Sequence, residues 1–227
     1  MVSLDAAELT TRQINTLLKK LAEDGEVIEV ENPRARHNMA VGILRPCDIH
    51  IRGSVGYYSA SLLDGPSITI DGNSGWALGE NLMSGKIVLT GDAGASVAAS
   101  MRGGEVFVGR NAGARAGISM KGGTLVVGGD SGFLTGFMMQ KGRIIVMGDT
   151  GEAVGDSMYE GVIYVGGAHG SLGSDAKVEE VGEGELIGLW DLLGRNGVDG
   201  KPHFTKIVSA KRLYHFDSLE RLERSAV

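Results

Sequence analysis

The stretch Gly85-Lys-Ile-Val-Leu-Thr-Gly91 carries the pattern that decides the fold. Ile87 and Leu89 are two residues apart, so in an extended strand both side chains point to one face. The closing glycine permits a tight corner, because glycine tolerates φ > 0 and close approach of backbones. A short strand followed by a glycine-rich corner is therefore the expected local unit.

This unit recurs every 19 residues. Within each of the following columns, neighbouring residues are 19 positions apart in sequence. One glycine column comprises Gly56, Gly75, Gly94, Gly113, Gly132, Gly151 and Gly170, and the column three residues earlier comprises Gly53, Gly72, Gly91, Arg110, Gly129, Gly148 and Gly167. The apolar columns are Ile49, Ile68, Ile87, Val106, Leu125, Ile144, Ile163; Ile51, Ile70, Leu89, Val108, Val127, Val146, Val165; and Leu63, Leu82, Met101, Met120, Met139, Met158. Small residues form a further column at Gly79, Ala98, Gly117, Gly136 and Gly155.

Seven copies in one register predict an all-β fold, a single-stranded parallel β-helix of about seven turns with like residues stacked inside. Adjacent turns would lie about 4.8 Å apart, which gives a rod of roughly 30 Å. Right-handedness is expected because parallel crossovers have that hand. Helical repeats would be broken by these glycines, and a propeller blade needs about 40 residues.

The flanks predict short elements outside the coil. Residues 9–25 predict an amphipathic helix capped by Thr10 or Thr11 and ended by Gly25, followed by a strand at 26–30. After Gly173 we expect a helix at 185–193, a turn-rich segment at 194–200, a strand at 204–208 and a helical tail at 218–224. The expected organisation is a helix–strand cap at 1–44, the β-helix at 45–173 and a C-terminal extension at 174–227.

Bulk properties restrict the class of protein. A formal charge of −6 argues against nucleic acid or an anionic membrane as the main partner. One cysteine cannot form an internal disulfide, and neither a long apolar span nor a signal-peptide pattern is found. These features predict a cytoplasmic protein.

Two glycine-rich or acidic patterns resemble ligand sites. Gly182-Glu-Gly184 fails the dinucleotide spacing by one residue, and corner geometry explains the other glycines. A mixed Asx column suggests calcium-binding β-rolls, although Asn and Asp also suit turns by bonding to backbone. Its members are Asn73, Asp92, Asn111, Asp130 and Asp149. Turn chemistry is the preferred interpretation.

Single residues offer further candidates. Cys47 and His50 have a metal-compatible spacing, but two ligands are too few for a site. His169 at a corner is interpreted as an exposed histidine, with an interface role left open. Arg110, with Arg102 and Arg115 nearby in sequence, could hold an acidic ligand, pair across an interface or be solvated. No catalytic, cofactor-binding or metal residue is assigned.

The Gly-x-x-Gly corners at a 19-residue step, such as Gly148-Asp-Thr-Gly151 followed by Gly155, resemble the GXGXG domain. That domain closes the glutamate synthase large subunit and also forms the β-helical subunit of formylmethanofuran dehydrogenase. Residues 45–173 carry the resemblance, and residues 36–43 look like the lead-in to the glutamate synthase version. As a free-standing chain it is most similar to the domain-3-like subunit of glutamate synthase-like complexes.

This resemblance implies a non-catalytic structural subunit of an enzyme complex. The implied partners are an amidotransferase-like subunit and an FMN-binding subunit that also holds an iron–sulfur cluster, with no cofactor on this chain. The implied reaction converts glutamate and methylamine to N-methylglutamate and ammonia. Two alternatives stay open. One is a scaffold in a formylmethanofuran dehydrogenase-like one-carbon complex, and the other is a hydrolase or lyase that uses the coil flank, where Asp130 and Asp149 stack.

Overall fold

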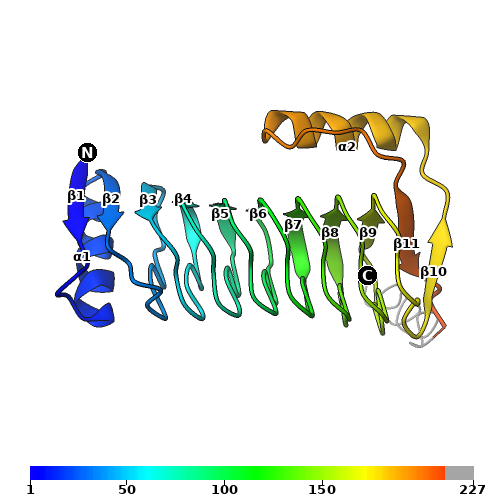
Figure 1. Cartoon of the computed structure of the whole chain (residues 1–227), viewed down its shortest axis with the longest axis horizontal. Coiled ribbons are helices and arrows are strands. Elements are labelled where there is room, and N and C mark those ends of the chain that lie inside the picture. The colour runs from blue at the N-terminus through cyan, green and yellow to red at the C-terminus, as the bar shows by residue number, and fades with distance from the viewer. Residues whose placement is uncertain (213–227) are drawn as a thin grey trace, which may run out of the picture.

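A computed structural model describes residues 1–212 and confirms the sheet-dominated β-helix as a rod of stacked parallel strands (Figure 1). The described strands form one eleven-stranded sheet in the order β1-β2-β3-β4-β5-β6-β7-β8-β9-β11-β10. The strands are β1 Val2–Asp5, β2 Val27–Glu31, β3 Asp48–Arg52, β4 Asp64–Ile70, β5 Ser84–Leu89, β6 Glu105–Val108, β7 Lys121–Val127, β8 Lys141–Val146, β9 Val162–Val165, β10 Ala176–Glu179 and β11 Thr205–Ser209. The helices are α1 Thr11–Glu23 and α2 Glu183–Arg195.

The predicted ladders are confirmed by the strand register. Ile49 pairs with Ile68 and Ile68 with Ile87, each 19 residues on, and the pairing continues in register to β9. The side chains of these inward columns are buried, as are all members of the Leu/Met column from Leu63 to Met158. Full burial of such a side chain contributes about 1.5–3 kcal/mol, so the stacked interior accounts for much of the stability.

Each turn also contains one single-residue bridge on a second side of the coil. These parallel bridges join Val55, Ser74, Ala93, Ala112, Ser131 and Thr150 in succession. The coil therefore has one strand and one single-residue pairing per turn, and the strand is the part that the repeat predicted.

Close approach between turns explains the corner glycines. A Cβ added at Gly75 would lie 2.8 Å from the backbone nitrogen of Tyr57, and one at Gly113 would lie 2.7 Å from that of Ala95. Positive φ occurs instead at a later corner, where Tyr58 and Arg115 adopt φ of 57° and 59°. The left-handed conformation is therefore not confined to glycine in this coil.

The N-terminal end of the rod is covered by α1, as predicted (Figure 1). Thr10 is the N-cap and forms a capping box with Gln13, while Ile14 and Leu18 are fully buried against the first turns. The predicted strand at 26–30 is β2. Strand β1 was not predicted, because four residues of alternating burial are too short a pattern; it pairs with β2 in parallel.

The C-terminal extension folds back on the sheet. Strand β11 pairs antiparallel with β9, and β10 pairs antiparallel with β11. The helix predicted at 185–193 is α2, which is longer than predicted. The segment that follows it begins at Asn196, two residues later than the predicted start at 194. Strand β10 was not predicted, and the helix predicted at 218–224 lies outside the described residues.

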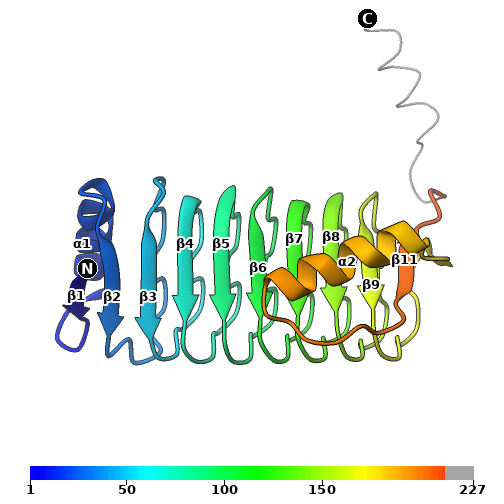
Figure 2. The ribbon, with the colours of Figure 1, turned by 90° about the horizontal axis from the view of Figure 1, so that it is seen from above.

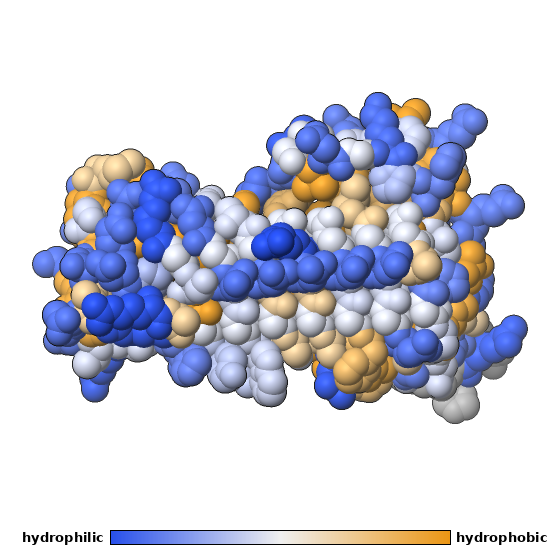
Figure 3. Space-filling model, in the orientation of Figure 1, coloured by the Kyte–Doolittle hydropathy of each residue, from blue (hydrophilic) through white to orange (hydrophobic). Residues whose placement is uncertain are grey.

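Helix α2 runs obliquely across the outer face of the last strands (Figures 1 and 2). Its residues Leu189, Leu192 and Leu193 pack with one outward residue from each strand from β6 to β9. These are Phe107, Val126, Ile145 and Tyr164. Hydrophobic surface is visible between this helix and the rod in Figure 3. The molecule therefore has a second, smaller core outside the coil.

Candidate functional site

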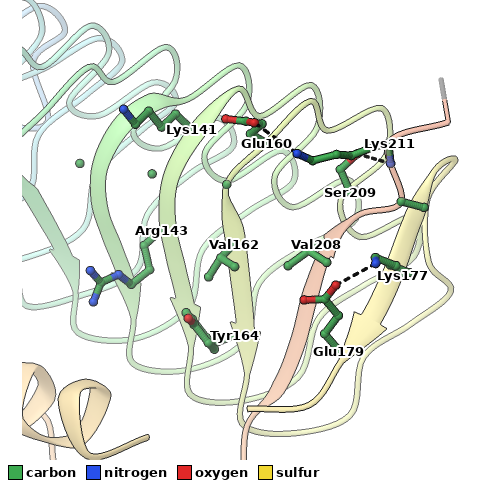
Figure 4. Close-up of a pocket in the computed structure, with 14 residues that line it drawn as sticks. Lys141, Arg143, Glu160, Val162, Tyr164, Lys177, Glu179, Val208, Ser209 and Lys211 are labelled. Carbon is green, nitrogen blue, oxygen red and sulfur yellow. Dashed lines mark hydrogen bonds and ion pairs between the residues drawn. The ribbon is translucent and has the colours of Figure 1, made fainter. Parts of the chain in front are cut away.

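A cleft of about 650 Å³ lies where β8 and β9 meet the antiparallel pair β11–β10 (Figure 4). Val162 of β9 and Val208 of β11 line it with apolar surface. Six charged side chains also line it, and they are Lys141, Arg143, Glu160, Lys177, Glu179 and Lys211. Four cations and two carboxylates make the cleft locally basic on a chain whose formal charge is −6.

Both carboxylates of the cleft are paired with lysines. Lys177 Nζ lies 2.8 Å from Glu179 Oε1, and Lys211 Nζ lies 3.6 Å from Glu160 Oε1 (Figure 4). Arg143 is half-buried, and its guanidinium makes no hydrogen bond or ion pair with another residue of the described part of the chain. The β8 side of the cleft therefore presents unneutralised positive charge.

A polar cluster joins the cleft to the start of α2. The Tyr164 hydroxyl donates to Glu185, and Lys206 Nζ lies 3.1 Å from the same carboxylate. Burial, helped by the Glu185 hydrogen bond, raises the pKa of Tyr164 well above its usual value. Burial alone would raise the pKa of Glu185, but hydrogen bonds from Tyr164 and Lys206 outweigh it and lower that pKa. Tyr164 thus stays a protonated donor and Glu185 an ionised acceptor.

The Asx column forms a hydrogen-bonded ladder. The backbone N–H of Asp92 donates to Asn73 Oδ1 at 2.9 Å, and that of Asp149 donates to Asp130 Oδ1 at 2.8 Å. The intervening turns and Ala168 repeat this bond. Figure 3 shows a hydrophilic band that runs along the rod. The structural role is therefore different from the predicted local turn. Each side chain satisfies a backbone donor 19 residues on, in the next turn of the coil, and not its own backbone, and none of the five residues has a positive φ.

Cys47 and His50 do not form a site together. Cys47 packs against the interior, and burial, followed by the nearby Asp48 charge, raises the pKa of its thiol. His50 Nε2 lies 2.7 Å from Asp71 Oδ2, and Arg52 Nη1 lies 2.9 Å from the same oxygen. Among residues 1–212, no group of three His, Cys, Asp or Glu side chains is placed to hold a metal ion.

The remaining candidates are surface residues. His169 is exposed and its Nδ1 lies 2.8 Å from the carbonyl oxygen of Gly170, as its corner position predicted. Arg110 is exposed, whereas Arg115 lies over the ring of Phe133 at 5.2 Å. Arg102, Arg110 and Arg115 occupy different positions of the 19-residue repeat. Gly182 is the N-cap of α2.

Comparison with known proteins assigns the family. Residues 34–187, more than half of the chain, match the GXGXG motif family. The chain belongs to that family. The match begins before the predicted coil and ends inside α2, so the family pattern includes part of both flanks.

A relative of this GXGXG chain is Protein GlxC of Rhizobium meliloti (strain 1021), which is 41% identical over 75 residues. The match covers 32% of this chain and 33% of that protein, so the chain spans about a third of the curated relative's length. Both helices in the described part of the GXGXG chain are too short or too polar to span a lipid bilayer.

Sequence reasoning missed the residues of the basic cleft. Arg143 belongs to an outward strand column that also contains Glu105 and Thr124. The residue type in this column changes from turn to turn, so the 19-residue repeat does not mark Arg143. Lys177 and Lys211 reach the same cleft only because β11 returns antiparallel to the coil and pairs with β9 on one side and with β10 on the other. No spacing within the 19-residue repeat predicts that return.

Proposed function

We propose that this chain is a non-catalytic structural subunit of a glutamate synthase-like complex, and specifically the β-helical, domain-3-like subunit of N-methylglutamate synthase. Membership of the GXGXG motif family over residues 34–187 is the observation that carries the proposal. In this assignment the complex converts glutamate and methylamine to N-methylglutamate and ammonia. The chain is then part of an enzyme without supplying reacting groups.

The contacts of the conspicuous polar residues support a structural role. The Asx ladder bonds to the backbone of the coil, and His50 pairs with Asp71. Tyr164 and Glu185 attach α2 to the sheet. These side chains are used to hold the rod together, and a rod with ladders along its length offers rigid surfaces on several sides for other subunits.

The proposed partners are an amidotransferase-like subunit and an FMN-binding subunit with an iron–sulfur cluster. FMN would carry the redox chemistry on that partner. The residues of this chain would position the partners and exclude water at the interfaces.

Purification of the tagged chain from its native host tests the proposal. We expect two further subunits, flavin absorbance, iron in the preparation and formation of N-methylglutamate from glutamate and methylamine. The purified chain alone should show no such activity, and adding it to partners prepared without it should restore activity. A lone monomer would contradict the proposal. Molybdenum or tungsten in place of FMN would instead support the one-carbon complex.

A further inference from the structure

We propose that the basic cleft beside β8 is a docking site for an acidic segment of a partner protein, with Arg143 as the receptor of its carboxylate. This inference rests on the proposed function, because it requires a complex. Residues of three adjacent segments, β8, β9 and the β11–β10 pair, build the cleft, so its shape is fixed by the sheet.

The pairing of charges in the cleft leaves positive charge on one side. Glu160 and Glu179 are each paired with a lysine. Neither the Arg143 guanidinium nor the Lys141 ammonium forms a hydrogen bond or ion pair with any residue in the range 1–212. Both come from β8, as Figure 4 shows, so the unneutralised charge is concentrated at one edge of the cleft.

The neighbouring carboxylates are not available to Arg143. Glu185 already accepts hydrogen bonds from Tyr164 and Lys206. Glu105 shares the strand column of Arg143 but lies two turns away, about 10 Å along the rod. A half-buried guanidinium without a partner presents several N–H donors in a planar fork that matches a carboxylate.

The cleft suits a protein segment better than a free small ligand. It is open, so a small molecule would keep much of its surface in water, whereas pockets for small ligands enclose most of the molecule. Val162 and Val208 supply apolar surface between the charged edges, which fits an apolar residue next to an acidic one on an extended segment. A partner that covers the cleft would exclude water and strengthen the arginine–carboxylate pair.

Charge substitution in the purified complex tests the site. Arg143→Glu should lower the amount of identified partner subunits that co-purify by at least tenfold, and Arg143→Gln should lower it less. Arg110→Glu is the matched control, because it makes the same charge change on an exposed corner. It should leave recovery unchanged. Circular dichroism of each variant should match that of the unmodified chain.

A zero-length cross-link identifies the occupant. Carbodiimide treatment of the complex should join Lys141 Nζ to an Asp or Glu of a sequenced partner subunit, and Lys141→Gln should abolish that product. Exchanging the cross-linked carboxylate for lysine should restore binding to Arg143→Glu. Unchanged recovery with Arg143→Glu would overturn the inference while leaving the proposed function intact.

Titration with small anions tests whether the cleft instead binds a small anionic ligand. Free glutamate, succinate and inorganic phosphate are the probes, followed by NMR of the isolated chain. Saturable binding that Arg143→Gln removes, together with unchanged partner recovery, would overturn docking in favour of a small anionic ligand. If the unmodified chain recovers no partner at all, the proposed function fails and the docking inference fails with it.

Discussion

One outward column of the sheet has two halves with different chemistry. From β6 to β9 its residues are Phe107, Val126, Ile145 and Tyr164, and α2 covers them. From β2 to β4 its residues are Glu29, His50 and Thr69, which α2 does not reach. The inward columns are apolar in both halves.

The difference teaches that the backbone ladder does not decide where the helix packs. All these strands pair in parallel, and the outward column stays in register through both halves, so the two halves offer similar backbone surfaces. The outward side chains differ, because the covered half buries apolar surface whereas Glu29, Arg52 and Asp71 form ion pairs on the other half. Apolar burial therefore determines the position of α2.

The largest expected effect comes from truncating the covered half. Ile145→Ala should reduce the stability of α2 docking by about 2–5 kcal/mol, because it removes buried methyl groups and leaves a cavity. The chain has two tryptophans, Trp76 on a corner and Trp190 on α2. Urea titration followed by Trp190 fluorescence in a Trp76→Phe background measures the change.

Thr69→Ala is the matched control for that prediction. Thr69 occupies the same column on the uncovered half, and its substitution should change stability by less than about 0.5 kcal/mol. Equal effects at the two positions would show that the halves do not differ in the way described.

A smaller effect is expected at the polar attachment of α2. Tyr164→Phe removes the hydroxyl that donates to Glu185, and a hydrogen bond to a charged group is worth about 1.5–3 kcal/mol. Lys206 still pairs with Glu185, so we expect a loss of about 1.5 kcal/mol in the same titration. Tyr58→Phe, at an exposed corner, should leave the stability unchanged. An equal loss of stability in that variant would contradict the role of the Tyr164 hydroxyl in attaching α2.

The coil could be predicted from sequence because its side chains repeat with its turns. Ile87 and Val106 are buried in the same way and stack on one another, so a 19-residue step in sequence corresponds to one step in space. The Asx ladder follows for the same reason, since Asp130 repeats the bond made by Asn111. A repeating environment selects repeating residues.

The elements outside the coil were harder to predict because their contacts are not periodic. Arg143 and Lys177 meet in one cleft although 34 residues separate them and β11, which comes later in the chain, lies between β9 and β10. The outward apolar residues under α2 do follow the repeat, but the sequence pattern does not show what covers them. Sequence therefore predicted the scaffold and left its binding surface unassigned.

A third prediction concerns the pH dependence of the stability of the uncovered half. Burial alone would raise the pKa of Asp71, but hydrogen bonds from Arg52 and His50 outweigh it and lower that pKa. A lowered folded-state pKa contributes stability above the unfolded value of about 3.9, and this contribution is lost as the pH falls through the folded-state pKa. Because the network is partly exposed, we expect a loss below about 1 kcal/mol.

Unfolding of the unmodified chain and of Asp71→Asn between pH 7 and pH 2 measures this contribution. The variant should be less stable at pH 7, and the two curves should converge in acid as Asp71 is protonated. Fluorescence of Trp190 should report little of the change, because α2 lies on the other half. Parallel curves at every pH would contradict the assigned role of Asp71.

The smallest expected effect lies at the boundary between the halves. Lys86 Nζ donates to Asn196 Oδ1 at 2.7 Å, and this bond joins β5 to the residue that ends α2. A double-mutant cycle with Lys86→Met and Asn196→Ala should give a coupling of about 0.5 kcal/mol, because the bond is partly exposed. Methionine keeps apolar contact with Phe107, over whose ring Lys86 lies at 5.1 Å, so the cycle isolates the polar bond. Hydrogen exchange should quicken only in the last turn of α2. Faster exchange along the whole helix would mean that this polar bond, and not the apolar column beneath α2, sets the edge of the covered half.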